Sequence, residues 1–432
     1  KANYKKKNGG VADLEWKASF ADKRGVLNMS ETKMSQLLRQ RNFQSEATGS
    51  LLAFTIPHLM FNLNGKVMFD WQRVSAGWNS LSDASGSEQK TWLLGAFVSP
   101  KILLHFGNRL QWLVYVPVGV KYYHSADGSL DYDKRFFSIC PYSNLTYKPT
   151  GRLSFDLTTI CEESMPSVLS QMVLKHFVNY RTTMSNPHQV EIAPNRSVKL
   201  AFTSSYKDII KMLFGGVTLS YVDARNGNSM GYQVIDDVVN YIVQPQSTKN
   251  RVWQIEQTVA KGFFRWNSKI TESLSIGTSR SEYYVGGDCH DGRSDYLQAK
   301  ISYVASVRKW LNLSISNDYS VSKPYTDGKA SGEVYRTFMN ASSFTFWLGK
   351  QLNVVPSVQY YHNNYFSSGR NNVFLNTVME YYWGNATLSL KCTNLLDSRT
   401  FHRIIDNGIT RYSGEYQLRG RTILFGIRIK II

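Results

Sequence analysis

The side chains best able to do chemistry gather in residues 286–291, which read Gly-Gly-Asp-Cys-His-Asp. Carboxylate, thiolate and imidazole groups are the usual protein ligands of zinc and calcium. Their spacing here matches neither a zinc nor a calcium signature, and Asp and Gly are also ordinary loop residues. The sequence contains no serine-hydrolase elbow, paired-histidine zinc motif or phosphate-binding loop. We therefore expect no metal, no cofactor and no catalytic site.

Aromatic residues in polar connecting segments are the second group with binding chemistry. Rigid rings beside polar groups suit the capture of a sugar, a peptide or a siderophore. For each residue taken singly, packing within a loop or at a membrane edge is the alternative. The candidate ligand-binding residues are Trp78, Tyr283, Tyr284, Tyr325, Tyr365 and Phe366.

The elements that must position these residues show an apolar–polar alternation with a period of two. At the end of the chain, apolar residues from Ile423 to Ile431 alternate with Gly426, Arg428 and Lys430. The same pattern runs through residues 297–307, 311–316 and 352–361. Such alternation predicts strands with one apolar and one polar face, repeated along the whole chain.

Short and long connections follow one another in turn. Long polar loops are expected at residues 75–89, 286–294, 322–333 and 363–372. Short periplasmic turns, long external loops and strands of about 10 residues are typical of outer-membrane β-barrels. A soluble β-sandwich or propeller is the alternative, but it does not require two classes of connection. Tight turns are expected near residues 22–25, 64–65, 107–108, 148–151, 207–208, 266–267, 308–309, 349–350 and 384–385.

The composition excludes several other classes. The net charge is +18, yet apart from Lys5–Lys7 the basic residues are dispersed between apolar ones, which argues against nucleic-acid binding. No window of about 18 apolar residues predicts a membrane-spanning helix. Hydrophobic residues make up 42% of the chain and aromatic residues 13%, which suits a folded barrel with interfacial girdles of rings.

The turns imply about nineteen strands, the first running towards the periplasm, so we expect an all-β transmembrane antiparallel β-barrel with about 18–20 visible strands. Complete bacterial barrels have an even number of strands. Because no break in composition divides the chain, we expect residues 1–432 to be a single outer-membrane barrel domain without a plug domain. The odd number of strands predicts that the first strands are also absent.

Two groups of motifs resemble a known family. Asn394–Asp397 (Asn-Leu-Leu-Asp) and Gly420-Arg421-Thr422, before the closing strand, resemble the C-terminal end of TonB-dependent outer-membrane receptors. Phe137–Lys148, followed by Asn186-Pro187 and the strand 198–206, resembles the Bacteroidetes outer-membrane β-barrel family. The resemblance implies a 22-stranded barrel behind a plug domain, and no plug-like segment is found in these residues. In that family, the lipid-facing row of the last strand usually ends on an aromatic residue. Here the corresponding row ends on Ile431.

The leading hypothesis is an integral barrel of the Gram-negative outer membrane that takes up a scarce solute such as a siderophore, a glycan or a peptide. The resemblance implies TonB as a partner, acting through a plug domain. Membrane lipid or lipopolysaccharide and a surface lipoprotein are further expected partners. A passive porin without a plug is the main alternative, and a surface-binding or assembly barrel is another. Barrel-shaped phospholipases and proteases are the exception to the expectation of no enzyme activity.

Overall fold

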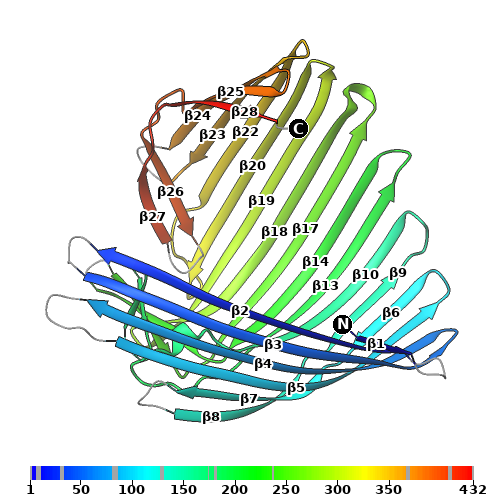
Figure 1. The fold of residues 1–432 in the computed structure, drawn as a ribbon, viewed down its shortest axis with the longest axis vertical. Helices are drawn as coiled ribbons and strands as arrows, with labels where there is room; N and C mark the ends of the chain where they lie inside the picture. Colours follow the sequence, from blue (N-terminus) through cyan, green and yellow to red (C-terminus); the bar gives the residue numbers. More distant parts are fainter. Residues whose placement is uncertain are drawn as a thin grey trace.

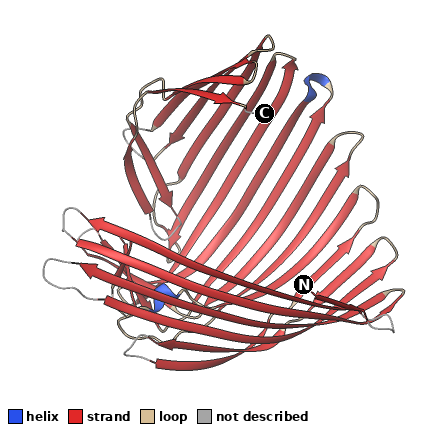
Figure 2. Cartoon of the chain, in the orientation of Figure 1, coloured by secondary structure: helices blue, strands red, loops and turns tan. Residues whose placement is uncertain are grey.

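The computed structural model of the chain consists almost entirely of β-strands. It describes residues 2–5, 11–29, 34–79, 86–126, 131–173, 175–179, 182–235, 238–365, 370–406 and 411–430. Twenty-six strands form one sheet and two more form a separate hairpin (Figure 2). The all-β fold class expected from the sequence is confirmed. Among the described residues, no helix is long and apolar enough to cross a membrane.

Strands follow one another along the whole described part of the chain, with two short 3-10 helices between them. The first half contains β1 (Ala2–Lys5), β2 (Val11–Met29), β3 (Met34–Ile56), β4 (Leu59–Asn79), β5 (Gly86–Phe106), β6 (Leu110–Tyr115), β7 (Val118–Ala126), β8 (Asp131–Ile139), β9 (Tyr142–Tyr147), β10 (Leu153–Ser164), the 3-10 helix η1 (Val168–Gln171), β11 (His176–Asn179), β12 (Thr182–Ser185), β13 (Asn195–Asp208) and β14 (Leu213–Asn226). The second half contains β15 (Ser229–Ile235), β16 (Val238–Gln244), β17 (Thr248–Phe263), the 3-10 helix η2 (Arg265–Asn267), β18 (Ser268–Val285), β19 (Asp288–Arg308), β20 (Leu311–Thr326), β21 (Lys329–Ala330), β22 (Tyr335–Leu348), β23 (Leu352–Asn363), β24 (Asn371–Trp383), β25 (Ala386–Thr393), β26 (Thr400–Asp406), β27 (Arg411–Gln417) and β28 (Thr422–Ile429).

The long strands pair antiparallel with their neighbours, and Figure 1 shows them as one strongly curved wall. β6 and β7 are two parts of one crossing, because both pair with β5. β8 and β9 are likewise two parts of the next crossing. Counted this way, the described strands from β2 to β28 make eighteen crossings, and β1 is the nineteenth strand, in agreement with the count expected from the sequence. The wall is that of an outer-membrane β-barrel.

Short turns join the strands along the upper and right side of Figure 1, and the longer connections lie on the lower left. By the outer-membrane pattern, these are the inner (periplasmic) end and the outer end of the wall. Six of the expected inner turns are confirmed within one residue, and the turn expected at 207–208 lies two residues later, after β13 ends. The inner turns fall at residues 57–58, 107–109, 148–152, 209–212, 264–267, 309–310, 349–351 and 384–385.

Two expected turns are wrong. Residues 22–25 lie inside β2, where the Asp22 carboxylate accepts hydrogen bonds from Arg39 of β3 at 2.6 and 3.1 Å. This run of polar residues forms a cross-strand ladder rather than a turn. Residues 64–65 lie inside β4, and the turn falls instead at Pro57-His58. Proline suits a turn because its φ is fixed and it has no N–H to donate to the sheet.

Strands continue into three of the expected long loops. β4 runs on to Asn79 and β5 begins at Gly86, so most of the expected loop 75–89 is strand, and residues 80–85 lie outside the described residues. Two more expected loops are wrong for the same reason. β18 and β19 meet across Gly286-Gly287, so 286–294 is a tight hairpin at the outer end. The two glycines have φ of +61° and +103°, which side chains other than glycine rarely adopt. β20 likewise runs on to Thr326 and turns at Asp327-Gly328. The barrel wall therefore extends well beyond the membrane on this side.

The outward face of the wall is apolar across its middle. One register row runs through six adjacent strands, and every residue in it is apolar. Four of its side chains, on β13, β14, β17 and β18, are 42–48% exposed, as expected for a surface that meets hydrocarbon instead of a protein core. The row is Phe202, Leu219, Ile255, Ile276, Leu297 and Val321.

In the connection between β10 and β13, residues 165–194, the described residues fold against the inner side of the wall, and we call them the inward segment. Val168 and Met172 of the inward segment pack on Val74 and Ala76 of β4, and all four are buried. Gln36 of β3 exchanges hydrogen bonds with the backbone of Phe177 at 2.7 and 2.9 Å. The segment is thus fixed to β3 and β4, far from the strands that it connects.

Candidate functional site

Three prolines interrupt the wall beside the inward segment. Pro100, Pro117 and Pro141 lie next to one another, because Val116 N–H donates to Pro100 O at 3.1 Å and Cys140 N–H donates to Pro117 O at 3.2 Å. Proline has no N–H, so the ladder of hydrogen bonds breaks at each of them. The interruption separates β6 from β7 and β8 from β9. A cavity of about 610 Å³, the first cavity, lies here between β4, β5, β7, β8 and the inward segment.

A buried ion pair closes one side of the first cavity. Lys121 of β7 donates to Glu163 of β10 at 2.8 Å, and their side chains are only 9% and 3% exposed. Arg196 of β13 contacts the second carboxylate oxygen at 3.2 Å. A charge removed from water needs such partners, because an unpaired buried charge costs several kcal/mol. The ion pair therefore joins β7 to β10, which do not pair directly: β7 pairs with β5 and β8, and β10 pairs with β9 and β13.

The inward segment is held over the first cavity by a chain of polar side chains. The side-chain oxygen of Gln171 accepts hydrogen bonds from the hydroxyls of Tyr123 and Ser125, the latter at 3.0 Å. Gln89 of β5 in turn donates to Ser125 at 2.7 Å. Within the segment, the Asn186 side chain bonds both backbone groups of Val190, at 2.8 and 3.2 Å. The Asn186-Pro187 motif noted in the sequence thus has a structural role.

A second cavity, of about 410 Å³, lies on the other side of the inward segment, at the outer ends of β14 and β17. Tyrosine rings, carboxamides and hydroxyls line it, and the Ser229 hydroxyl is buried without a hydrogen-bond partner among the described residues. Such a lining suits a polar ligand that offers both apolar faces and hydrogen-bonding groups. The polar and aromatic lining residues include Tyr232, Tyr241, Tyr283, Asn226, Asn228, Ser229 and Thr248.

Of the four predicted aromatic residues whose side chains the structure describes, Tyr283 is the one that lines this second cavity. Its ring stacks on Tyr232 with centroids 6.4 Å apart and planes 19° apart, and it lies 5.7 Å from the His290 ring. Its hydroxyl is 3.4 Å from the hydroxyl of Thr326. β15, β18, β19 and β20 therefore all help to position this ring.

The other predicted aromatic residues that the structure describes, Tyr284, Tyr325 and Tyr365, do not join Tyr283 in one cluster. Tyr284 follows it on the opposite face of β18, and Tyr325 lies on the outward face, where Arg293 and Lys323 each approach its ring to 5.2 Å. Tyr365 stacks on Tyr335 with centroids 4.1 Å apart. The backbone of Trp78 belongs to β4, but its side chain lies outside the described residues, as does Phe366.

Two metal-capable residues of segment 286–291, His290 and Asp291, are engaged in local contacts. His290 contacts the Asp327 carboxylate at 2.8 Å, and the same carboxylate accepts the Asp291 N–H at 2.9 Å. The Asp291 carboxylate pairs with Arg280. Throughout the described part of the chain, no three acidic, histidine or cysteine side chains are grouped as a metal site requires. These contacts strengthen the outer hairpins.

Sequence reasoning missed Glu163 and Lys121. On β10, Glu163 lies two residues after Cys161, and the partners of these two residues on β13 are Arg196 and Val198. Strict alternation therefore places Glu163 on the same lipid-facing side as Cys161. Two adjacent glutamates, Glu162 and Glu163, in an otherwise alternating strand were the available signal of an irregular site.

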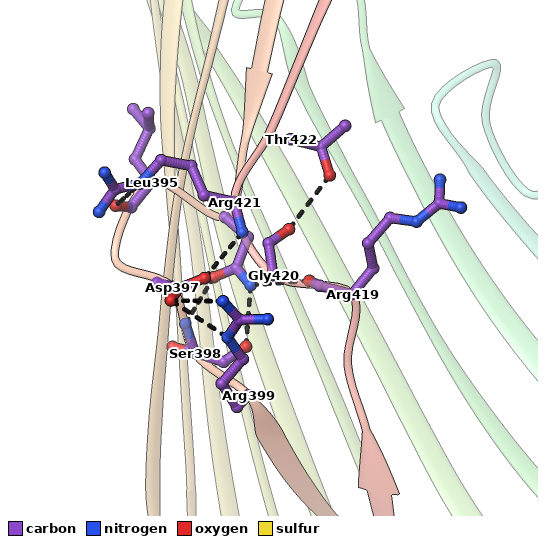
Figure 3. A network of polar contacts seen from close by, with 9 residues as sticks. Leu395, Asp397, Ser398, Arg399, Arg419, Gly420, Arg421 and Thr422 are labelled. Atoms are coloured by element: carbon purple, nitrogen blue, oxygen red, sulfur yellow. Dashed lines mark hydrogen bonds and ion pairs between the residues drawn. The ribbon is translucent and has the colours of Figure 1, made fainter.

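The C-terminal motif residues fasten the β26–β27 hairpin to the wall (Figure 3). Asp397 accepts the Arg421 N–H at 2.8 Å and the Arg399 guanidinium at 2.9 and 3.1 Å, while Arg421 donates to Leu395 O at 3.0 Å. The pKa of Asp397 lies below its usual value, chiefly because the Arg421 N–H and then Arg399 stabilise the carboxylate. A Cβ at Gly420 would overlap the Arg399 guanidinium and lie 2.7 Å from Asp397 Oδ1, so a side chain there would displace one of these two groups.

No protein-family model matches the chain, and no curated protein matches it. Its fold is similar to solved structures at low sequence identity. The FpvAI–pyocin S2 complex aligns with a TM-score of 0.51 and 8% identity, over 99% of this chain and 56% of that one. The ferric yersiniabactin uptake receptor FyuA from Yersinia pestis gives 0.49 and 12%, over 98% and 70%. The copper transporter OprC gives 0.49 and 9%, over 97% and 80%.

This chain spans little more than half of the FpvAI chain that it matches. That likeness shows a shared fold. Together with the apolar outward face, it identifies the chain as an integral β-barrel of the outer-membrane type.

Proposed function

We propose that this chain is the barrel of a TonB-dependent receptor that takes up a scarce solute, such as a siderophore, a glycan or a peptide, across the outer membrane. The observation that carries the proposal is the inward segment. It is fixed to the inner side of the wall by buried contacts and leaves a polar, aromatic-lined cavity on each side. A solute arriving from outside meets these cavities first.

The proposed mechanism has two stages. The second cavity first captures the solute, with Tyr283 and its neighbours giving ring faces and hydrogen bonds. A plug domain then moves under the pull of TonB, which uses the energy of the inner membrane, and the solute passes through the barrel. A surface lipoprotein over the outer hairpins would retain the solute during capture. The C-terminal motifs and the barrel fold support this assignment.

Uptake that depends on both this protein and TonB is the test. Cells with and without the protein, each with TonB intact or disrupted, are grown on their native medium, and the medium is compared by mass spectrometry. We expect at least one solute to be depleted only when both are present. Two results together would instead establish a passive porin. The solute would be depleted whenever the protein is present, with or without TonB, and liposomes that contain the purified protein would swell in a sugar solution.

A further inference from the structure

Three arginines stand side by side on the outward face of the wall. Arg251 of β17 pairs in register with Arg280 of β18, and Arg280 pairs with Arg293 of β19. Paired residues of adjacent strands share a face and lie about 5 Å apart. Arg280 is four residues along β18 from Ile276 of the apolar row, on the same face. The three guanidiniums therefore form a row along the outer border of the membrane-facing surface.

The row lies just outside a level of rings. Between it and the apolar row is the level of Tyr221 and Trp253, whose ring centroids lie 4.4 Å apart with the planes tilted by 35°. Tyrosine and tryptophan mark the membrane–water boundary in barrels of this type. Successive residues on one face are about 7 Å apart, because a strand rises about 3.4 Å per residue. The arginines thus stand at the depth of lipid headgroups.

Each arginine keeps capacity for another partner. Asp223 is 3.7 Å from Arg251, Asp291 accepts from Arg280 Nε at 2.8 and 3.0 Å, and Asp295 accepts from Arg293 at 2.7 Å. The arginine side chains nevertheless remain 49%, 64% and 54% exposed. Exposed ion pairs contribute about 0–1 kcal/mol, so they do not exclude a stronger anion.

The surrounding charge on this face is positive. At the outer ends of β14 and β17–β20, six basic side chains stand against four acidic ones on the outward face, a surplus of 6 − 4 = +2. The six are Arg225, Lys249, Arg251, Arg280, Arg293 and Lys323, and the four are Asp223, Glu282, Asp291 and Asp295.

An apolar groove runs directly below the row. It has a volume of about 580 Å³ and lies on the same strands. Lys323, which approaches the ring of Tyr325, stands at its outer edge. Guanidinium groups above an apolar groove match a molecule with an anionic head and a hydrocarbon tail. The apolar side chains of the groove include Leu219, Trp253, Ile255, Ile276, Leu297 and Val321.

We propose that this face of β17–β20 is a binding site for an outer-leaflet lipid with a phosphorylated headgroup. Its phosphates lie on Arg251, Arg280 and Arg293, and an acyl chain lies in the groove below. Arginine suits this role because its planar fork of donors binds phosphate oxygens in pairs. The site rests on the proposed place of the barrel in the outer membrane and does not depend on transport.

The test measures lipid retained by the full chain. Protein extracted from outer membranes in mild detergent is analysed by native mass spectrometry, as wild type, as Arg280→Ala/Arg293→Ala and as the inner-end control Arg265→Ala/Arg308→Ala. We expect phosphorylated lipid on the wild type and the control, and at least a ten-fold loss on the outer double variant. Equal retention by the two double variants would overturn the site.

Two further measurements keep the test decisive. Arg280→Lys/Arg293→Lys keeps the positive charge but loses the paired donors of the guanidinium groups. We expect this variant to retain less lipid than the wild type. It serves as the test if the alanine variant does not fold. Inorganic phosphate at 10 mM should not raise the thermal stability of delipidated protein, whereas added phosphorylated lipid should. An equal rise with phosphate alone would replace the lipid site by a soluble-anion site. Solute uptake that persists in a lipid-depleted variant separates this proposal from the transport function.

Discussion

At the scale of single residues, the structure depends on a few positions at which little substitution is tolerated. Glu163 is buried between two cations, and its carboxylate joins β7, β10 and β13 at the interruption made by the prolines. Gly420 is equally constrained, because any side chain there would overlap the contacts of Asp397. Both residues act through electrostatics or close packing, so conservative changes should have measurable effects.

Replacing Glu163 by Gln should destabilise the barrel by roughly 3 kcal/mol, because it leaves Lys121 buried without a countercharge. Glu162→Gln, one residue away, is the matched control and should change stability by less than about 0.5 kcal/mol. Urea unfolding in detergent, followed by tryptophan fluorescence, measures both. Equal midpoints for the two variants would show that the ion pair does not hold the wall together.

Gly420→Ala should weaken the attachment of the β26–β27 hairpin by about 1–3 kcal/mol, since the added methyl displaces Asp397 or Arg399. Gly151→Ala is the control, because nothing lies within 4 Å of a Cβ built at that turn. Limited trypsin digestion of the folded protein reports the difference. We expect faster cleavage in the hairpin of Gly420→Ala alone, and equal cleavage in the two variants would contradict the packing argument.

At the scale of elements, the strands follow directly from the sequence, whereas several connections do not. Alternation predicts strands well here because the two faces of each strand meet different solvents. Polar and glycine residues give a wrong prediction where the strands extend into water. The residue types at 22–25 and 286–294 predict a turn and a loop, yet cross-strand pairing continues through both segments. The position of the inward segment could not be predicted from the sequence, because the residues it contacts, Val74 and Gln36, lie at least about ninety residues away along the chain.

The same limit explains which candidate residues the sequence could find. Tyr283 was recognisable as a ring in a polar surrounding, and the structure places it in a cavity lining. Its neighbours there, Tyr232 and Ser229, come from a strand whose position depends on pairing with β16 and β18. Long-range pairing of this kind leaves no local pattern.

Acid should release the β26–β27 hairpin. The folded pKa of Asp397 is lowered from its ordinary value near 3.8 by the Arg421 N–H and Arg399. Its stabilising contribution is therefore complete above that ordinary value and is lost as the pH falls through the lowered pKa. Hydrogen exchange of the hairpin should rise below about pH 4 in the wild type. In Asp397→Asn it should already be raised at pH 7 and change little with pH. A parallel pH dependence of both proteins would exclude Asp397 as the group responsible.

At the scale of the whole molecule, the wall combines two kinds of surface. The outward face, which meets lipid, carries an apolar row, and aromatic rings and arginines lie above that row towards the outer end. The inner side carries the inward segment, with a cavity on each side of it. This arrangement fits a receptor that captures a solute at the outer end before the solute crosses the barrel. We propose that the second cavity makes that capture.

The most direct measurement compares two adjacent tyrosines in the energised uptake assay. Tyr283 lines the second cavity, and Tyr284 points to the opposite face of β18. For the solute whose uptake requires this protein, Tyr283→Ala should raise the half-saturating concentration at least ten-fold, whereas Tyr284→Ala should stay within two-fold of the wild type. Uptake equally affected, or equally unaffected, by both changes would contradict the assignment of the second cavity as the capture site.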